Sequence, residues 1–197
     1  HRNEGTLANI VLWHCQQQGQ VAAFHPVTRL DRDTYGLVLV AKHSHSHARL
    51  QELAQAGQVQ KTYHALVFGG PREDAGVVDA PIARRELPSL LRYVNSTGKP
   101  SRTEYRVLRR WSDRSLLELT PVTGRTHQLR VHCAYIGCPI LGDPQYGTQS
   151  SLELSARLGL ESQRMSAKQL RFVHPITGEE IFLQSRQGVE KKKKKST

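Results

Sequence analysis

Four strand-like segments follow one another between residues 61 and 120, and no helical pattern separates them. They span residues 61–68, 76–82, 103–109 and 115–120, and glycine, proline or polar residues bound them, as is usual for strands. Consecutive strands with few helices between them favour an α+β fold. We therefore expect a mixed, largely antiparallel central sheet.

Helical patterns flank this series of strands. Apolar side chains recur at helical spacing in the expected helices, which span residues 6–15, 44–55, 126–137 and 151–159. Three further strands are expected at residues 36–41, 169–174 and 180–184. The expected architecture is thus a central sheet with flanking helices.

The composition fits one domain with a polyanionic partner. The chain has 197 residues, enough for a single core, and a formal net charge of +11. The run Lys191–Lys195 supplies five of these charges, so about +6 remains on the rest of the chain. A basic body favours nucleic acid as the partner. We expect one domain over residues 1–187 and a basic, disordered tail over residues 188–197.

The cysteines and the hydropathy favour a cytoplasmic protein. Cys15, Cys133 and Cys138 are odd in number and form no CxxC pair, which fits a reducing compartment. No apolar run approaches the ~20 residues that span a bilayer, and the first residues do not form a signal peptide. We expect no membrane partner.

Two carboxylates stand directly before the short apolar strand. Asp31 lies between two arginines of the segment 28–36, Asp33 follows the second of them, and the apolar run 37–41 comes next. A carboxylate at the edge of a core needs a cation or hydrogen-bond donors, so such a segment often marks a functional site. The same residues also fit a polar turn with exposed charges.

Two other segments carry candidate binding groups. Residues 123–132 open a helix, where free N–H groups attract anions. Four side chains there can donate to a phosphate or a carboxylate, namely Arg125, His127, Gln128 and Arg130. On the strand at 61–68, Lys61 and Tyr63 share a face and can contact a phosphate and stack on a base. A basic helix start paired to surface acids and a half-buried strand tyrosine are the alternatives.

Patterns for metal or thiol chemistry are weaker. The alternating histidines of 43–47 fall at an expected helix start, where they are solvated. A DxD magnesium site at Asp31 and Asp33 leaves Arg125 and Tyr63 without a role. Cys133 falls on an apolar helix face and fits the core. We expect no metal site.

Together the three charged segments resemble motifs of the RluA-like family of RNA pseudouridine synthases. Residues 28–38 are similar to HRLDxxTSGLL, and residues 61–65 match KxYxA. Residues 124–147 match GRTHQLRxHxAxxGxPIxGDxxYG almost without a break. The resemblance extends from about Gly5 to Leu183 and implies the pseudouridine synthase catalytic fold.

The resemblance implies a role for each catalytic group. Asp31 corresponds to the nucleophile and Arg125 to the arginine that pairs with it and keeps it ionised. Tyr63 corresponds to the tyrosine against the target uracil, and Leu129 to an aliphatic residue near the base. Arg29 corresponds to the arginine that fills the gap left by a flipped-out nucleotide.

The implied reaction converts uridine in RNA to pseudouridine without a metal or an organic cofactor. Structured ribosomal or transfer RNA is the implied partner, so the implied processes are rRNA and tRNA processing. Lys61, His127, Gln128 and Arg130 are expected to bind the RNA. We expect a monomer that needs no protein partner.

Three departures from the family pattern stand out. Thr28 replaces the usual His, and Tyr35 replaces the usual Ser. An upstream strand region with a motif like NKPxGxxVHP is missing before Gly5, apart from His1. These departures leave open a second function, in which the chain holds RNA without isomerising it. A metal-dependent transferase is a third alternative.

Overall fold

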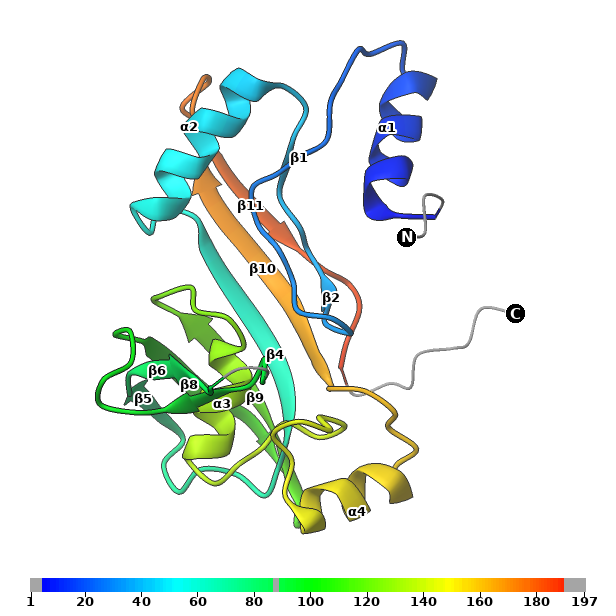
Figure 1. Cartoon of the computed structure of the whole chain (residues 1–197). Coiled ribbons are helices and arrows are strands. Elements are labelled where there is room, and N and C mark those ends of the chain that lie inside the picture. The colour runs from blue at the N-terminus through cyan, green and yellow to red at the C-terminus, as the bar shows by residue number, and fades with distance from the viewer. Residues whose placement is uncertain (1–4, 87–88, 190–197) are drawn as a thin grey trace.

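The computed structural model describes residues 5–86 and 89–189, which form an α+β fold (Figure 1). The helices are α1 (Leu7–Gln17), α2 (Ser44–Gln55), α3 (Gln128–Tyr135) and α4 (Gln149–Arg157). The longer strands are β4 (Gln60–Phe68), β5 (Ala75–Asp79), β8 (Arg102–Arg110), β9 (Arg114–Pro121), β10 (Met165–Val173) and β11 (Glu180–Gln184). The short strands are β1 (His25–Pro26), β2 (Tyr35–Gly36), β3 (Val40–Ala41), β6 (Ile82–Arg84) and β7 (Arg92–Val94). The run Lys191–Lys195 of the expected tail lies outside the described residues.

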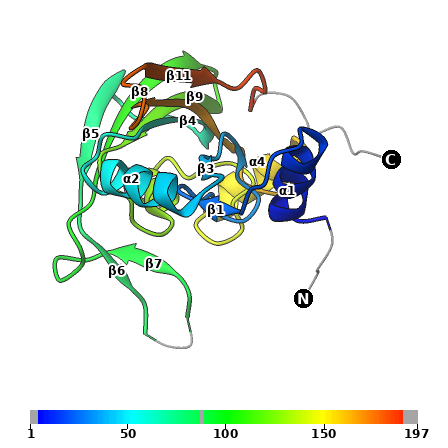
Figure 2. The same ribbon diagram turned by 90° about the horizontal axis from the view of Figure 1, so that it is seen from above.

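The central sheet is mixed and largely antiparallel, as the sequence predicted. Its strands follow the order β11-β10-β4-β9-β8-β5, and every neighbouring pair along this path is antiparallel. The short strand β2 adds the one parallel pairing of this sheet, to β10. Figure 2 shows the sheet as one layer with α1, α2 and α4 on the same side.

The core forms where the helices meet the middle strands. Alternation along β4 buries Tyr63, Ala65 and Val67 on one face. Leu129 and Cys133 of α3 pack against that face. Full burial of a leucine or valine side chain contributes about 1.5–3 kcal/mol, so this cluster anchors α3 firmly on the sheet.

Two more clusters fix α2 and α4. Leu50 of α2 packs with Val59, Leu170 and Phe172. Leu154 of α4 packs with buried leucines that precede it in the chain, Leu66 and Leu141.

The expected strand at 36–41 is interrupted. The structure has β2 at its start and β3 at its end, while residues 37–39 belong to no strand. The Leu37 N–H donates to the Ala167 carbonyl, and the Leu39 N–H donates to Thr28 Oγ1. Single tertiary hydrogen bonds thus replace a continuous strand ladder in this segment.

The expected helix over 126–137 is shorter than predicted. It begins at Gln128 because His127 has a left-handed backbone with φ of 57°. Residues 84–100 were expected as a loop or hairpin connection, and β6 and β7 pair there as an antiparallel hairpin. This hairpin extends away from the sheet (Figure 2).

Within the described residues no helix is long and apolar enough to cross a bilayer. The three cysteines are free and buried.

Candidate active site

The three charged segments meet at one cleft of about 230 Å³. Its walls are the loop before β2, the start of β4 and the turn between β9 and α3. All the predicted site residues except Arg130 line it: Arg29, Asp31, Lys61, Tyr63, Arg125, His127, Gln128 and Leu129. Pairing of β4 with β9 brings together motifs that are distant in the sequence.

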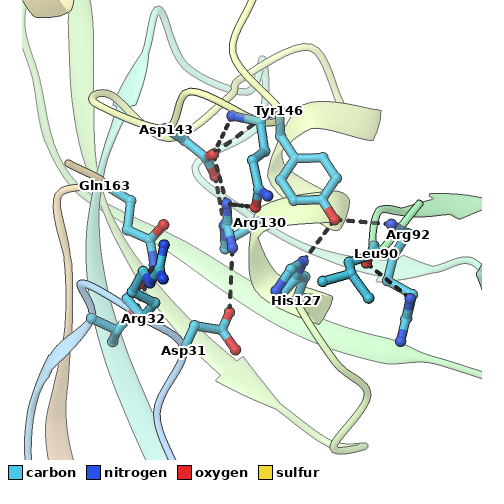
Figure 3. Close-up of polar contacts among 11 residues, drawn as sticks. Asp31, Arg32, Leu90, Arg92, His127, Arg130, Asp143, Tyr146 and Gln163 are labelled. Atoms are coloured by element: carbon cyan, nitrogen blue, oxygen red, sulfur yellow. Dashed lines mark hydrogen bonds and ion pairs between the residues drawn. The ribbon is translucent and has the colours of Figure 1, made fainter. Parts of the chain in front are cut away.

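Asp31 lies on a turn that is fastened to the segment before β10. The Thr34 N–H donates to the Asp31 carbonyl, and Asp33 takes a left-handed φ of 67°. The Gln163 amide nitrogen donates to the Arg32 carbonyl at 2.7 Å and to Thr34 Oγ1 at 2.9 Å (Figure 3). These bonds hold the turn, and with it the Asp31 carboxylate, in the cleft.

Both residues that depart from the family's first motif make hydrogen bonds. Thr28 is buried, and its Oγ1 accepts the Leu39 N–H at 2.9 Å. The Tyr35 hydroxyl donates to the Gly188 carbonyl at 3.2 Å. The turn that carries Asp31 therefore accommodates both side chains.

Arg130 is the cation that faces Asp31. Its Nη1 lies 3.9 Å from Asp31 Oδ2 (Figure 3), and its side chain is only 4% exposed. The Nε and Nη2 groups donate to the two oxygens of Asp143 at 2.7 and 2.8 Å, and Nη2 also donates to Gln145 Oε1 at 2.7 Å. This bidentate clamp fixes the plane of the guanidinium and leaves Nη1 on the side of Asp31.

The predicted ion pair of Asp31 with Arg125 is wrong. Arg125 precedes the left-handed His127, and its exposed side chain donates from Nε to the Pro100 carbonyl at 3.1 Å. Arg130 lies on the first turn of α3, where the helix carries it into the core. Both arginines belong to the same short motif, so sequence spacing did not distinguish them.

Tyr63 and Lys61 place two perturbed groups in the cleft. Burial, with the nearby charge of Asp31, raises the pKa of Tyr63 to about 12. The phenol is therefore protonated at neutral pH. Burial also lowers the pKa of Lys61, whose side chain lies on the same face of β4.

The side-chain amide of Gln128 makes hydrogen bonds within the protein and does not direct an unpaired donor or acceptor into the cleft. Its Oε1 accepts from Thr123 Oγ1 at 2.7 Å and from the Arg125 N–H at 3.0 Å. Its Nε2 donates to the Arg102 carbonyl at 2.9 Å and to Thr103 Oγ1 at 3.0 Å. We therefore reassign Gln128 from RNA contact to support of the 123–125 turn.

Asp143 and Tyr146 are site residues to which the sequence analysis assigned no role of their own. Asp143 is fully buried, and Tyr146 places its hydroxyl 2.8 Å from His127 Nδ1. Both belong to the GDxxYG end of the third motif. The available signal was Asp143 itself, since an acid that interrupts an apolar stretch needs a buried cation.

A second, more basic groove joins the cleft at residues 124–126. This hairpin groove has a volume of about 530 Å³ and lies between the β6–β7 hairpin and the turn before α3. Its cationic lining residues are Arg84, Arg92, Lys99 and Arg125. No acidic residue is among the described residues that line it. The uncompensated charge favours a polyanion.

Residues 5–86 and 89–189 contain no group of three or more His, Cys, Asp or Glu side chains placed to hold a metal ion.

Comparison with known proteins identifies related chains. Residues 14–135 match the model of the family described as RNA pseudouridylate synthase. The ribosomal large subunit pseudouridine synthase C of Vibrio cholerae is 41% identical over 155 residues, which are 79% of this chain and 49% of that protein. The ribosomal large subunit pseudouridine synthase D of Nitrosomonas europaea is 42% identical over 183 residues, 92% of this chain and 53% of that protein. The chain thus spans about half the length of these curated relatives.

Solved structures show the same fold. The human RNA pseudouridylate synthase domain containing 1 superposes with a TM-score of 0.73 at 29% identity, over 84% of this chain and 69% of that one. The human RNA pseudouridylate synthase domain containing 4 gives a TM-score of 0.71 at 30% identity, over 87% of this chain and 75% of that one.

Proposed function

This chain belongs to the RNA pseudouridylate synthase family, and we propose that it isomerises specific uridines in structured RNA to pseudouridine, with Asp31 as nucleophile. The observation that carries the proposal is the position of Asp31 in the cleft, 3.9 Å from the buried cation Arg130 and together with the protonated Tyr63. Two relatives are named for the ribosomal large subunit, which favours ribosomal RNA as substrate over transfer RNA.

The proposed chemistry redistributes bonds within one nucleotide. Asp31 attacks C1′, the N1–C1′ bond breaks, and its electron pair leaves with the uracil ring. The ring turns until C5 faces C1′. C5 then bonds to C1′ as the bond from Asp31 breaks and the carboxylate is released. C5 loses a proton and N1 gains one, so no external co-reactant is consumed.

Arg130 keeps the nucleophile ionised. A cation close to a carboxylate stabilises its charged form. The separation of 3.9 Å is an ion pair rather than a short hydrogen bond, so the Asp31 oxygens keep lone pairs for attack on C1′. Burial of Arg130 limits screening of this pair by water.

Tyr63 and Leu129 hold the base. The raised pKa keeps the Tyr63 hydroxyl protonated, so it serves as a hydrogen-bond donor and not as a base at neutral pH. Leu129 is buried, lines the same cleft and offers an apolar surface to the ring. The two side chains confine the uracil while it turns.

The target nucleotide must leave its stack, because a stacked base hides C1′ from a side chain. Arg29 lines the cleft and fills the vacated gap. Lys61 and His127 contact the flipped nucleotide from the same cleft. The hairpin groove binds phosphates of the flanking RNA with Arg84, Arg92, Lys99 and Arg125.

The test uses large-subunit ribosomal RNA transcripts labelled with tritium at uridine C5. Wild-type protein is expected to release tritium and to create pseudouridines at defined sites, which are detected as alkali-resistant carbodiimide adducts. The Asp31→Asn variant is expected to bind RNA but to release no tritium. Asp33→Asn is the matched control, because Asn tolerates the left-handed backbone of position 33.

Salt-dependent RNA binding by wild type without any tritium release, from ribosomal or transfer RNA, overturns the proposal. That result supports a chain that holds RNA without isomerising it. We also propose that the protein acts in the cytoplasm. We expect it to be a monomer, which sedimentation tests, with residues 1–187 as one catalytic domain, which limited proteolysis tests.

A further inference from the structure

The loop after α3 wraps around Arg130 from two directions. The Asp143 carboxylate clamps the edge of the guanidinium and also accepts the backbone N–H groups of Gln145 and Tyr146 at 3.0 and 3.3 Å. The ring of Tyr146 covers the face of the guanidinium, with 4.9 Å between Arg130 Cζ and the ring centroid. Asp143 thereby fixes both the cation and the tyrosine that stacks on it.

The hydroxyl of Tyr146 connects this pair to a distant element. It lies 3.0 Å from the backbone nitrogen of Arg92 in β7 and 2.8 Å from His127 Nδ1 (Figure 3). One aromatic side chain therefore touches the cation beside Asp31, a residue of the cleft and the protruding hairpin.

One arrangement of the protons in this bridge is favoured. A backbone N–H only donates, so the Tyr146 oxygen accepts from Arg92, and its own proton is available to His127 Nδ1. This arrangement needs a neutral His127 with its proton on Nε2. Burial and then the charge of Arg130 lower the pKa of His127, which favours the neutral ring.

We propose that Tyr146 is a positioning residue that couples the hairpin groove to the Asp31–Arg130 pair, an inference that rests on the proposed function. RNA phosphates bound by the hairpin groove hold β7 in place. The Arg92 N–H then orients the Tyr146 hydroxyl, and the ring keeps Arg130 aligned with Asp31. Engagement of flanking RNA is in this way transmitted to the chemistry without contact between Tyr146 and the target base.

The first test separates chemistry from binding. Tyr146→Phe keeps the stacking ring and removes only the hydroxyl. Its kcat is expected to fall about 10- to 100-fold through misalignment, while the Kd for RNA changes by less than about twofold. Tyr135→Phe is the matched control, since it removes the hydroxyl of an exposed tyrosine that lines neither the cleft nor the hairpin groove. It is expected to retain most of kcat.

The second test is a double-mutant cycle with a hairpin cation. Lys99→Gln removes an exposed groove charge and is expected to lower both RNA affinity and kcat in wild type. In the Tyr146→Phe background it is expected to lower affinity alone, because the connection to the cleft is already broken. Additive effects on kcat, or a kcat of Tyr146→Phe within about twofold of wild type, overturn the coupling.

A third measurement needs no turnover, so it separates this inference from the proposed function. Binding of RNA is expected to shift the His127 ring-nitrogen resonances and to slow hydrogen exchange of the Arg92 amide in wild type. Tyr146→Phe is expected to lose both responses while keeping its thermal unfolding midpoint. Identical responses in the two proteins overturn the coupling even if neither turns over.

Discussion

Arg130 points its Nη1 at Asp31 from 3.9 Å, and this direction is set by Asp143, which occupies the opposite edge of the same guanidinium. The carboxylate in the cleft therefore depends on a second carboxylate that lies in the core. The two acids have different consequences when they are replaced.

The first prediction concerns the two arginines of the third motif. Arg130→Lys keeps a charge but loses the bidentate fork, and it is expected to lower kcat by about 10²- to 10³-fold. Arg125→Lys is the matched control, expected to leave kcat near wild type because Arg125 contacts the Pro100 carbonyl rather than Asp31. Single-turnover tritium release measures both, and equal losses in the two variants would contradict the assignment.

The second prediction concerns stability. Asp143→Asn leaves the buried Arg130 charge without its clamp and is expected to cost about 3–5 kcal/mol in unfolding free energy. Asp74→Asn, which removes an exposed partner of Arg110, is expected to cost less than about 1 kcal/mol. Urea denaturation of both variants measures the difference, and comparable midpoints would argue against the buried clamp.

The third prediction concerns alkaline pH. The pKa of Tyr63 is about 12 in the folded protein, above the ordinary value of about 10. The unfolded chain thus loses this proton first, so the stability contributed by neutral Tyr63 is complete below pH ~10 and is lost as the pH rises through about 12. Tyr63→Phe is expected to remove a late step from the tyrosinate absorbance titration, whereas Tyr135→Phe, which removes the hydroxyl of an exposed tyrosine, is expected to keep it.

The fourth prediction concerns the strand that follows the Asp31 turn. Gly36 has φ of 114°, and a Cβ there would lie 2.2 Å from the Ala167 carbonyl oxygen. Gly36→Ala is expected to separate β2 from β10, to cost more than about 2 kcal/mol and to lower kcat. Position 57 also has a left-handed backbone, but a Cβ there would meet open space. Gly57→Ala is therefore expected to lower the unfolding free energy by about 1 kcal/mol. Chemical denaturation compares the two.

The fifth prediction concerns salt. Each phosphate contact contributes close to one unit to the slope of log K against log salt concentration. Arg84→Gln is expected to reduce this slope by about one, because Arg84 lies in the hairpin groove. Arg49→Gln, on the exposed face of α2 and paired with Glu52, is the control with an unchanged slope. Fluorescence anisotropy over a salt series measures both, and equal slopes would remove phosphate binding from the groove.

Local sequence patterns were enough to predict the sheet, and the resemblance of the three charged segments to motifs of one family predicted that they meet. Alternation along 61–68 predicted a buried face, and the structure buries Tyr63 and Ala65 there. Such patterns could not predict which arginine pairs with Asp31. Arg125 and Arg130 offer the same group within one motif, and the choice between them depends on the left-handed φ of His127 and on Asp143, which lies beyond the end of α3.

The interrupted strand at 36–41 has a similar explanation. Its apolar run predicted continuous pairing, but the backbone at Gly36 turns toward β10 and the Leu39 N–H finds the Thr28 hydroxyl. Tertiary hydrogen bonds decided the local structure, and hydropathy carries no information about them.

The fastening of the Asp31 turn bears on how the protein is made. Gln163 and β10 hold a turn that the ribosome completes more than a hundred residues earlier. Synthesis proceeds from the N-terminus, so the segment that carries Asp31 emerges without the strand that shapes it. A nascent chain that stops before β10 is expected to contain every cleft residue up to Leu129 and still to be inert. The segment that carries Asp31 therefore gains its folded geometry only after β10 has been synthesised.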